Sequence, residues 1–296
     1  MKPALLLIAA LLLSSASQAA DDGVPRRKPS SGLSVFANAG AVWADDNTSN
    51  FYSGRPGNAN TIDRVLHSET YGTRIWQDLK NAGLISSAIG NYSQLTVSEY
   101  ANMYYRTSFN LGLGIRYDYS SGLGWLLRFN MWRLRAAGAF NLSSDNGTGI
   151  LSDNHQYIRC GMMGKEDRIN IEFGLAYTFD LSDGLCLEID LGGGFNNTKV
   201  RENLMEIHGA TYSILDIWNG QSPSSYSGSY EYVNQGGLGW NLFGSAFLGY
   251  RVETVGAIKV GYTLTRSTVT HKKDNAGAGW SHCIDLRLEI NNFSFF

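Results

Sequence analysis

The chain has 296 residues, of which 34 are glycine, 12% are aromatic and 17% are charged, and its formal net charge is −2. The charged share is below the roughly 25% of an ordinary soluble domain, and the aromatic content is too high for a disordered chain. The near-neutral charge excludes the basic character on which most nucleic-acid binding depends, so we expect no nucleic-acid partner. The many aromatic and glycine residues, together with the low charged share, predict an all-β protein with a partly apolar surface.

The first residues have the organisation of a secretory signal peptide. Lys2 gives a positively charged start, and residues 4–13 form an apolar run that is too short for a membrane-spanning helix. The small residues Ser17 and Ala19 predict cleavage after Ala19 or Ala20. We therefore expect a signal peptide over 1–19, a periplasmic N-terminal segment over 20–31 and the folded domain over 32–296.

Alternation of apolar with polar or small residues dominates the chain after the signal, and a period of two is that of a β-strand. The clearest segments are 105–119, 168–180 and 185–196. Weaker copies of the pattern occur at 33–43, 125–135, 240–252, 258–264 and 281–296. The alternation therefore predicts about eight strands.

Short and long connections alternate strictly between these segments. The short ones, 120–124, 182–184 and 253–256, are rich in residues that favour turns. The long ones are about 44–99, 143–167, 197–235 and 267–279. Short turns on one side and long loops on the other are typical of outer-membrane barrels, so the order predicts four long extracellular loops.

The polar faces of the strands distinguish a membrane barrel from a soluble sandwich. A sandwich would place many Lys and Glu residues on its outer face, whereas these faces carry mainly Gly, Ser, Asn and Thr. Small polar residues suit a narrow lumen, and an apolar face with aromatic ends suits lipid. We predict an antiparallel up-and-down transmembrane β-barrel of eight strands, or of ten if residues 95–104 form an additional hairpin.

The signal peptide, the strands and the C-terminal Phe296 together resemble the small, OmpA/OmpX-like class of bacterial outer-membrane β-barrel proteins, without pointing to a specific family. Apolar residues precede Phe296 at alternate positions, namely Leu286, Leu288 and Ile290. The resemblance implies that Phe296 belongs to the signal read by the barrel assembly machinery. It also implies a location in the cell outer membrane of a Gram-negative bacterium, in contact with outer-membrane lipids.

The first long connection has helical character that the others lack. Residues 61–66 and 70–82 are expected to be helices, with Thr70 as the cap of the second and Ile75, Leu79 and Ala82 along one side. Such a helix would fold over the barrel mouth or pack on a partner. Residues 95–104 continue the alternation of the second strand, and the alternative to an additional hairpin is that this strand projects beyond the membrane.

No residue pattern indicates catalysis or cofactor binding. The five histidines are not spaced as metal ligands, and neither a G-x-S-x-G elbow nor a phosphate-binding loop before a helix is present. We therefore expect no catalytic, cofactor-binding or metal-binding residues. The three cysteines, Cys160, Cys186 and Cys283, match no zinc or redox spacing and are expected to be isolated thiols with at most one pair.

The inward faces of the predicted strands carry charges of both signs in similar number. Because an eight-stranded barrel is only wide enough for side chains, and buried charges must pair, these residues predict a structural charge network that fills the lumen. Its expected members are Arg106, Arg116, Asp118, Arg128, Arg168, Glu172, Glu188, Asp190, Lys259, Asp285, Arg287 and Glu289.

Three classes of function remain open at this point. The sequence favours a non-enzymatic structural or surface-interaction protein, whose long loops bind an unknown extracellular ligand or protein partner. A small pore or transporter is the alternative, and it would require a lumen lined mainly by one sign of charge. An outer-membrane enzyme acting on lipid or peptide would require a cluster of catalytic residues at the barrel rim.

Overall fold

The computed structural model describes residues 31–85, 90–144, 157–182, 184–215, 235–252, 256–272 and 278–291. The expected signal peptide and the terminal Phe296 lie outside these residues. None of the helices in the described ranges is long and apolar enough to cross a membrane.

An antiparallel barrel forms one end of the molecule. Its strands are β1 (Gly32–Trp43), β4 (Ser108–Asp118), β5 (Leu123–Ser144), β6 (Tyr157–Ser182), β7 (Leu185–Ile207), β9 (Leu238–Val252), β10 (Gly256–Thr268) and β11 (Ala278–Asn291). The ring closes because β1 pairs with both β11 and β4, while β5 pairs with both β4 and β6. The predicted eight-stranded up-and-down barrel is therefore confirmed.

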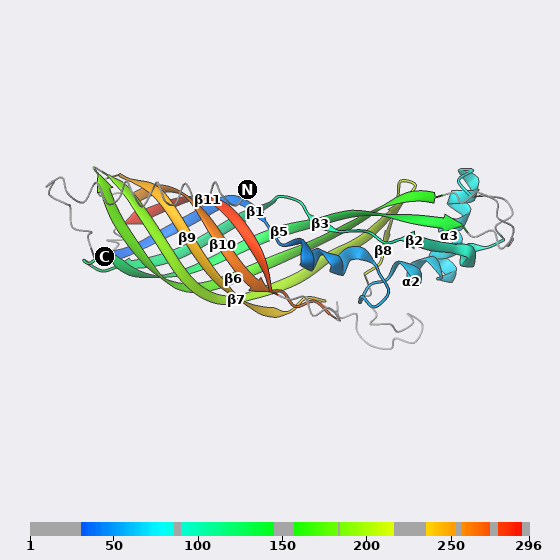
Figure 1. Ribbon diagram of the computed structural model, residues 1–296, viewed down its shortest axis with the longest axis horizontal. Coiled ribbons are helices and arrows are strands. Elements are labelled where there is room, and N and C mark those ends of the chain that lie inside the picture. The colour runs from blue at the N-terminus through cyan, green and yellow to red at the C-terminus, as the bar shows by residue number, and fades with distance from the viewer. Residues whose placement is uncertain are drawn as a thin grey trace.

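Three of these strands continue far beyond the barrel. The strands β5, β6 and β7 have 22, 26 and 23 residues, whereas β9, the longest of the other barrel strands, has 15. A membrane-spanning strand needs only about 9–11 residues. Figure 1 shows the three strands running on to the right as one sheet. The segments 143–167 and 197–235, expected to be loops, are thus in part strand.

Short strands widen this extension at both edges. β2 (Leu95–Glu99) and β3 (Tyr104–Tyr105) pair with β5, and β8 (Ala210–Ser213) pairs with β7. The segment 95–104 therefore belongs to the extension and adds no hairpin to the barrel, which has eight strands and not ten.

Helices from the first long connection pack against the extended sheet. They are η1 (Asp46–Ser53), α2 (Ile62–Leu66), α3 (Glu69–Asn81) and the short η2 (Tyr92–Gln94). Both predicted helices are present, but the cap of α3 is Ser68 rather than Thr70, because the Ser68 hydroxyl accepts the backbone N–H of Tyr71 at 2.9 Å. A serine hydroxyl at this position satisfies an N–H that the helix itself leaves without a partner.

The extension has a hydrophobic core of its own. Fully buried side chains come from the helices, among them Phe51, Ile62, Leu66, Ile75 and Leu79, and from the sheet, among them Leu134, Phe140, Leu142, Met162 and Met205. We call this unit the cap: the described residues of 46–105, β8, and the parts of β5, β6 and β7 beyond the barrel (134–144, 157–166 and 200–207). What the sequence predicted as separate loops is therefore a folded domain.

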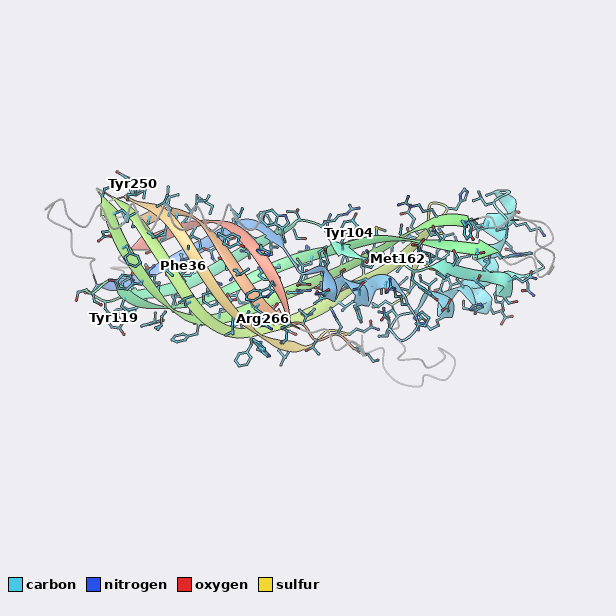
Figure 2. All side chains as sticks on the ribbon, viewed as in Figure 1. Phe36, Tyr104, Tyr119, Met162, Tyr250 and Arg266 are labelled. Atoms are coloured by element: carbon cyan, nitrogen blue, oxygen red, sulfur yellow. The ribbon has the colours of Figure 1, made fainter. Side chains whose placement is uncertain are left out.

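The apolar side of each barrel strand faces outward. Leu113 and Leu191 are each 62% exposed, although a soluble protein would bury such residues. Exposed tryptophans stand near the cap end of the barrel, at Trp43, Trp240 and Trp280, and exposed aromatic residues stand at the other end, at Tyr119, Tyr177, Phe179 and Tyr250. Figure 2 shows Tyr119 and Tyr250 at this far end. Two aromatic bands flanking an apolar one are the surface of a transmembrane barrel.

Candidate functional site

The barrel lumen is filled by a network of buried ion pairs centred on Glu188. This carboxylate, from β7, is paired with Arg116 of β4, Lys259 of β10 and Arg287 of β11. Arg287 also lies 3.0 Å from Asp190, and all of these side chains except that of Lys259, at 3%, are 1% exposed or less. Strands from opposite sides of the barrel therefore meet at one carboxylate, which leaves the middle of the lumen occupied.

Further pairs extend the network toward both ends. Arg128 Nε lies 2.5 Å from Glu172 Oε2, whose carboxylate also accepts a hydrogen bond from Asn130 at 2.9 Å. Arg116 Nε donates to Asp118 at 2.8 Å, and Lys259 is also paired with Glu289. Each buried charge among these has at least one partner of opposite sign, as burial requires.

Aromatic rings fill the space between the charged groups. The Arg287 guanidinium lies 4.5 Å from the centre of the Phe36 ring and 3.8 Å from that of Phe247. The Phe36 ring in turn covers Gly114, where an added Cβ would come within 2.2 Å of a ring carbon. Glycine is therefore needed at position 114 because the lumen is tightly packed.

The structure brings most of the predicted network together inside the barrel. The residues in the lumen are Arg116, Asp118, Arg128, Glu172, Glu188, Asp190, Lys259, Asp285, Arg287 and Glu289. Asp285 pairs with an amide rather than a cation, since it accepts from Asn110 Nδ2 at 2.7 Å. Arg168 is fully buried as well, but it lies at the mouth, where its partner Glu166 belongs to the cap.

Alternation predicts that Arg106 faces the lumen, and the structure corrects this prediction. Its side chain is exposed on the outside of the molecule, while its neighbour Tyr105 is buried. The reason is a break in the strand at residues 106–107, between β3 and β4. Alternation keeps its phase only within a continuous strand, so the extrapolation across this break placed Arg106 on the wrong face.

A second polar cluster closes the mouth of the barrel, and the sequence did not predict it. Its centre is Glu166, which accepts from Tyr52 at 2.7 Å, Tyr105 at 3.1 Å and Arg168 Nε at 2.6 Å. His271 Nε2 lies 2.9 Å from the same carboxylate, and its ring stacks on Phe51. We call Tyr52, Tyr105, Glu166, Arg168 and His271 the mouth cluster.

Electrostatics fix the ionisation of the mouth cluster. Burial alone would raise the pKa of Glu166, but Arg168, His271 and the hydrogen bond from Tyr52 outweigh burial and hold this pKa well below its usual range. Burial and the adjacent carboxylate raise the pKa of both Tyr52 and Tyr105 well above the ordinary tyrosine value. Glu166 is therefore a carboxylate, and the two tyrosines are neutral donors to it.

The members of the mouth cluster come from η1, β3, β6 and the segment after β10, so the cluster cannot be predicted from a local spacing of residues. The one local signal is that Glu166 and Arg168 lie two residues apart on the same face of a strand. The cluster can hold the cap onto the barrel and exclude water from the mouth.

Groups that could bind a metal or act as a nucleophile are not gathered at either cluster. Within the described residues no three potential metal ligands come together. Cys160, Cys186 and Cys283 are all buried free thiols, and burial raises the pKa of Cys160 in the cap to about 12. A thiol with so high a pKa is a poor nucleophile at neutral pH.

Comparison with known proteins gives a likeness of fold only. No family model matches the chain, and no curated protein matches it. Among solved structures it is similar to Neisserial surface protein A (TM-score 0.40, 9% identity, covering 88% of this chain and 97% of that chain). It is also similar to Ail of Yersinia pestis (TM-score 0.33, 11% identity, covering 88% of this chain and 100% of that chain). A third similar structure is the outer membrane protein OprG of Pseudomonas aeruginosa (TM-score 0.35, 9% identity, covering 88% of this chain and 97% of that chain). No specific family is indicated by these comparisons.

Proposed function

We propose that the protein is a non-enzymatic β-barrel of the bacterial outer membrane, whose filled lumen anchors a rigid cap that binds an extracellular ligand or protein partner. The observation that carries this proposal is that β5, β6 and β7 run without interruption from the barrel wall into the cap. A domain built on continuous strands is held in a fixed orientation to the membrane.

The location is supported by the outer surface of the barrel. Leu111, Leu175 and Val260 are between 52% and 57% exposed, and they lie in the apolar band between the two aromatic bands. Such a band in water would drive aggregation, whereas in a bilayer the acyl chains cover it and keep the apolar side chains away from water. The cap lies at the end opposite to the tight turn that joins Tyr119 to Leu123, and long connections face outward in barrels of this kind.

The structural role of the lumen is supported by its packing. An ion-conducting path needs continuous water, yet Glu188, Asp190 and Arg287 are buried and directly paired across the barrel axis. The mouth cluster then closes the cap end. Both features favour an anchor over the alternative of a small pore or transporter.

The test is a planar-bilayer recording on the refolded full-length protein. We expect no steady conductance, because the lumen and the mouth are both filled with side chains. Large, stable open channels from the unmodified protein would overturn the proposed role of the lumen and establish the pore.

The orientation is tested by thiol labelling on intact cells. We expect an impermeant maleimide to label Arg159→Cys on the cap but not Ser121→Cys in the turn at the opposite end. The native cysteines serve as an internal background, because they are at most 3% exposed. Labelling of Ser121→Cys alone would show that the cap faces the periplasm.

A further inference from the structure

A row of like charges crosses the outside of the sheet where the barrel passes into the cap. Arg106 lies beside Arg135, because its backbone N–H donates to the Arg135 carbonyl at 2.9 Å. Arg135 is in turn the direct cross-strand partner of Lys165. Like charges directly opposite one another destabilise a sheet, so this row is unfavourable unless an anion lies against it.

Three further cations border this row on the same face. They are Arg133, Lys199 and Arg201, and we call all six the cationic patch: Arg106, Arg133, Arg135, Lys165, Lys199 and Arg201. The carboxylates among them are Asp167, shared by Arg133 at 3.0 Å and Arg201 at 2.7 Å, and Glu202, which lies 2.7 Å from Lys165. Two carboxylates are therefore paired with three of the six cations.

The cations of the patch are available to a ligand. The side chains of Arg133, Arg201 and Lys165 are 61%, 48% and 42% exposed even with their partners in place. Arg106, Arg135 and Lys199 are exposed and form no ion pair with any residue that the structure describes. The whole chain carries a net charge of −2, so this excess of positive charge is local.

The patch borders the lipid-facing surface of the barrel directly. Arg133 is the direct partner of Phe109, which is 56% exposed, and the next outward residues toward the barrel are Met131 and Ile169. Trp43 lies at the end of β1, two strands along from β5, and is 40% exposed. The apolar and aromatic side chains thus end where the cations begin, and in a membrane barrel this boundary is the depth of the lipid headgroups.

The geometry points to a binding site for the phosphate groups of membrane-lipid headgroups, formed by the cationic patch on the leaflet next to the cap. Guanidinium groups bind phosphate oxygens in bidentate fashion, and the patch offers four of them. Lipid is favoured over a soluble anion because the patch is continuous with the apolar band, so one molecule can place its acyl chains on the band and its phosphate on the patch. The inference rests on the proposed membrane location and not on the closed lumen.

The experiment measures lipid selectivity by electron paramagnetic resonance. The full-length protein is reconstituted in phosphatidylcholine vesicles with a trace of spin-labelled phosphatidic acid or spin-labelled phosphatidylcholine. We expect phosphatidic acid to be enriched in the motionally restricted layer around the protein. Arg135→Gln should lower the enrichment by up to about fivefold toward parity, because a cation near an anionic membrane surface contributes about that factor. The triple change at Arg106, Arg135 and Lys165 should abolish it.

Arg159→Gln is the matched control, because Arg159 is an exposed arginine on β6, six residues further into the cap than Lys165, the cross-strand partner of Arg135. It should leave the selectivity unchanged. An equal loss in Arg159→Gln and Arg135→Gln would overturn the inference in favour of a general charge effect. Displacement of the labelled lipid by inorganic phosphate at matched concentration would overturn it in favour of a site for free phosphate.

Failure of this inference can be told from failure of the proposed location. A restricted lipid layer without preference for phosphatidic acid means that the protein is inserted and the cationic patch does not bind headgroup phosphate. The absence of any restricted layer means that the barrel does not lie in the bilayer.

Discussion

The hydroxyl of Tyr52 lies 2.7 Å from Oε2 of Glu166, although the two residues are 114 positions apart in the chain. Tyr52 belongs to η1 of the cap, and Glu166 lies on β6 just above the barrel. This hydrogen bond therefore joins the helical side of the cap to the strand that enters the membrane. The mouth cluster is the point at which the two parts of the protein depend on each other.

Glu166→Gln should destabilise the cap by about 3–5 kcal/mol, because it leaves the buried Arg168 without its counter-charge. Urea unfolding followed by tryptophan fluorescence measures the change, since Trp132, at the base of the cap, is buried in the same hydrophobic cluster as the cap residues. Glu202→Gln is the control: its exposed pair with Lys165 contributes about 0–1 kcal/mol. Similar losses in both variants would show that the mouth cluster has no special role.

The stability of the cap should fall in acid. The pKa of Glu166 is lowered in the folded state, so the unfolded chain takes up the proton more readily. Its contribution is therefore complete above the unfolded value of about 4.3 and is lost as the pH falls below that value. Unfolding midpoints measured from neutral pH downward should decline in the native protein and decline less steeply in Glu166→Gln. An identical slope in the two proteins would assign the acid sensitivity to other carboxylates.

Leu113→Arg should impair barrel assembly, because a charge in the middle of the apolar band costs about 2–4 kcal/mol. Tyr157→Arg is a closely matched control: the two side chains are 62% and 63% exposed, but Tyr157 lies on the cap. The measurement is the fraction of protein with heat-modifiable gel mobility after refolding. Gly114→Ala is no neutral comparison, since its added methyl group would meet Phe36. Equal yields from the two arginine variants would place the apolar band outside lipid.

Removal of single cations from the lumen should have graded effects on stability. Arg128→Ala leaves Glu172 with no cationic partner among the described residues, whereas Arg116→Ala leaves Glu188 paired with Lys259 and Arg287. We therefore expect a loss of about 3–5 kcal/mol for Arg128→Ala and a smaller one for Arg116→Ala. Thermal unfolding in detergent measures both. The reverse order would show that the pairs seen here do not determine stability.

Alternation was sufficient to predict the barrel, because lipid outside and a polar lumen inside impose opposite demands on successive residues. It correctly placed Leu111, Leu113 and Leu191 on the outward faces of their strands, which meet lipid. It failed at Arg106, where the strand is broken and the phase is not carried across.

The cap was not predicted because its strands invert the pattern of the barrel. On β5 the outward Phe129 and Met131 are apolar in the barrel, whereas in the cap the inward Leu134 and Phe140 are apolar and the outward Arg135 is charged. The same strand keeps its orientation while its surroundings change from lipid to water and from a polar lumen to an apolar core. A change of phase from odd to even apolar positions near residue 132 is the signal that could have revealed the domain.

The cap also imposes an order of assembly. Its core joins residues of the connection between β1 and β4 to residues of β5, β6 and β7, so it cannot be completed until the hairpin of β6 and β7 is in place. Contacts between residues so distant in sequence form slowly. In the proposed orientation all of these segments reach the cell surface as unfinished pieces, and Glu166 meets its partner His271 only after the segment that follows β10 has arrived. We therefore expect the cap to be a late-folding unit, whose closure comes at the end of barrel insertion rather than at its beginning.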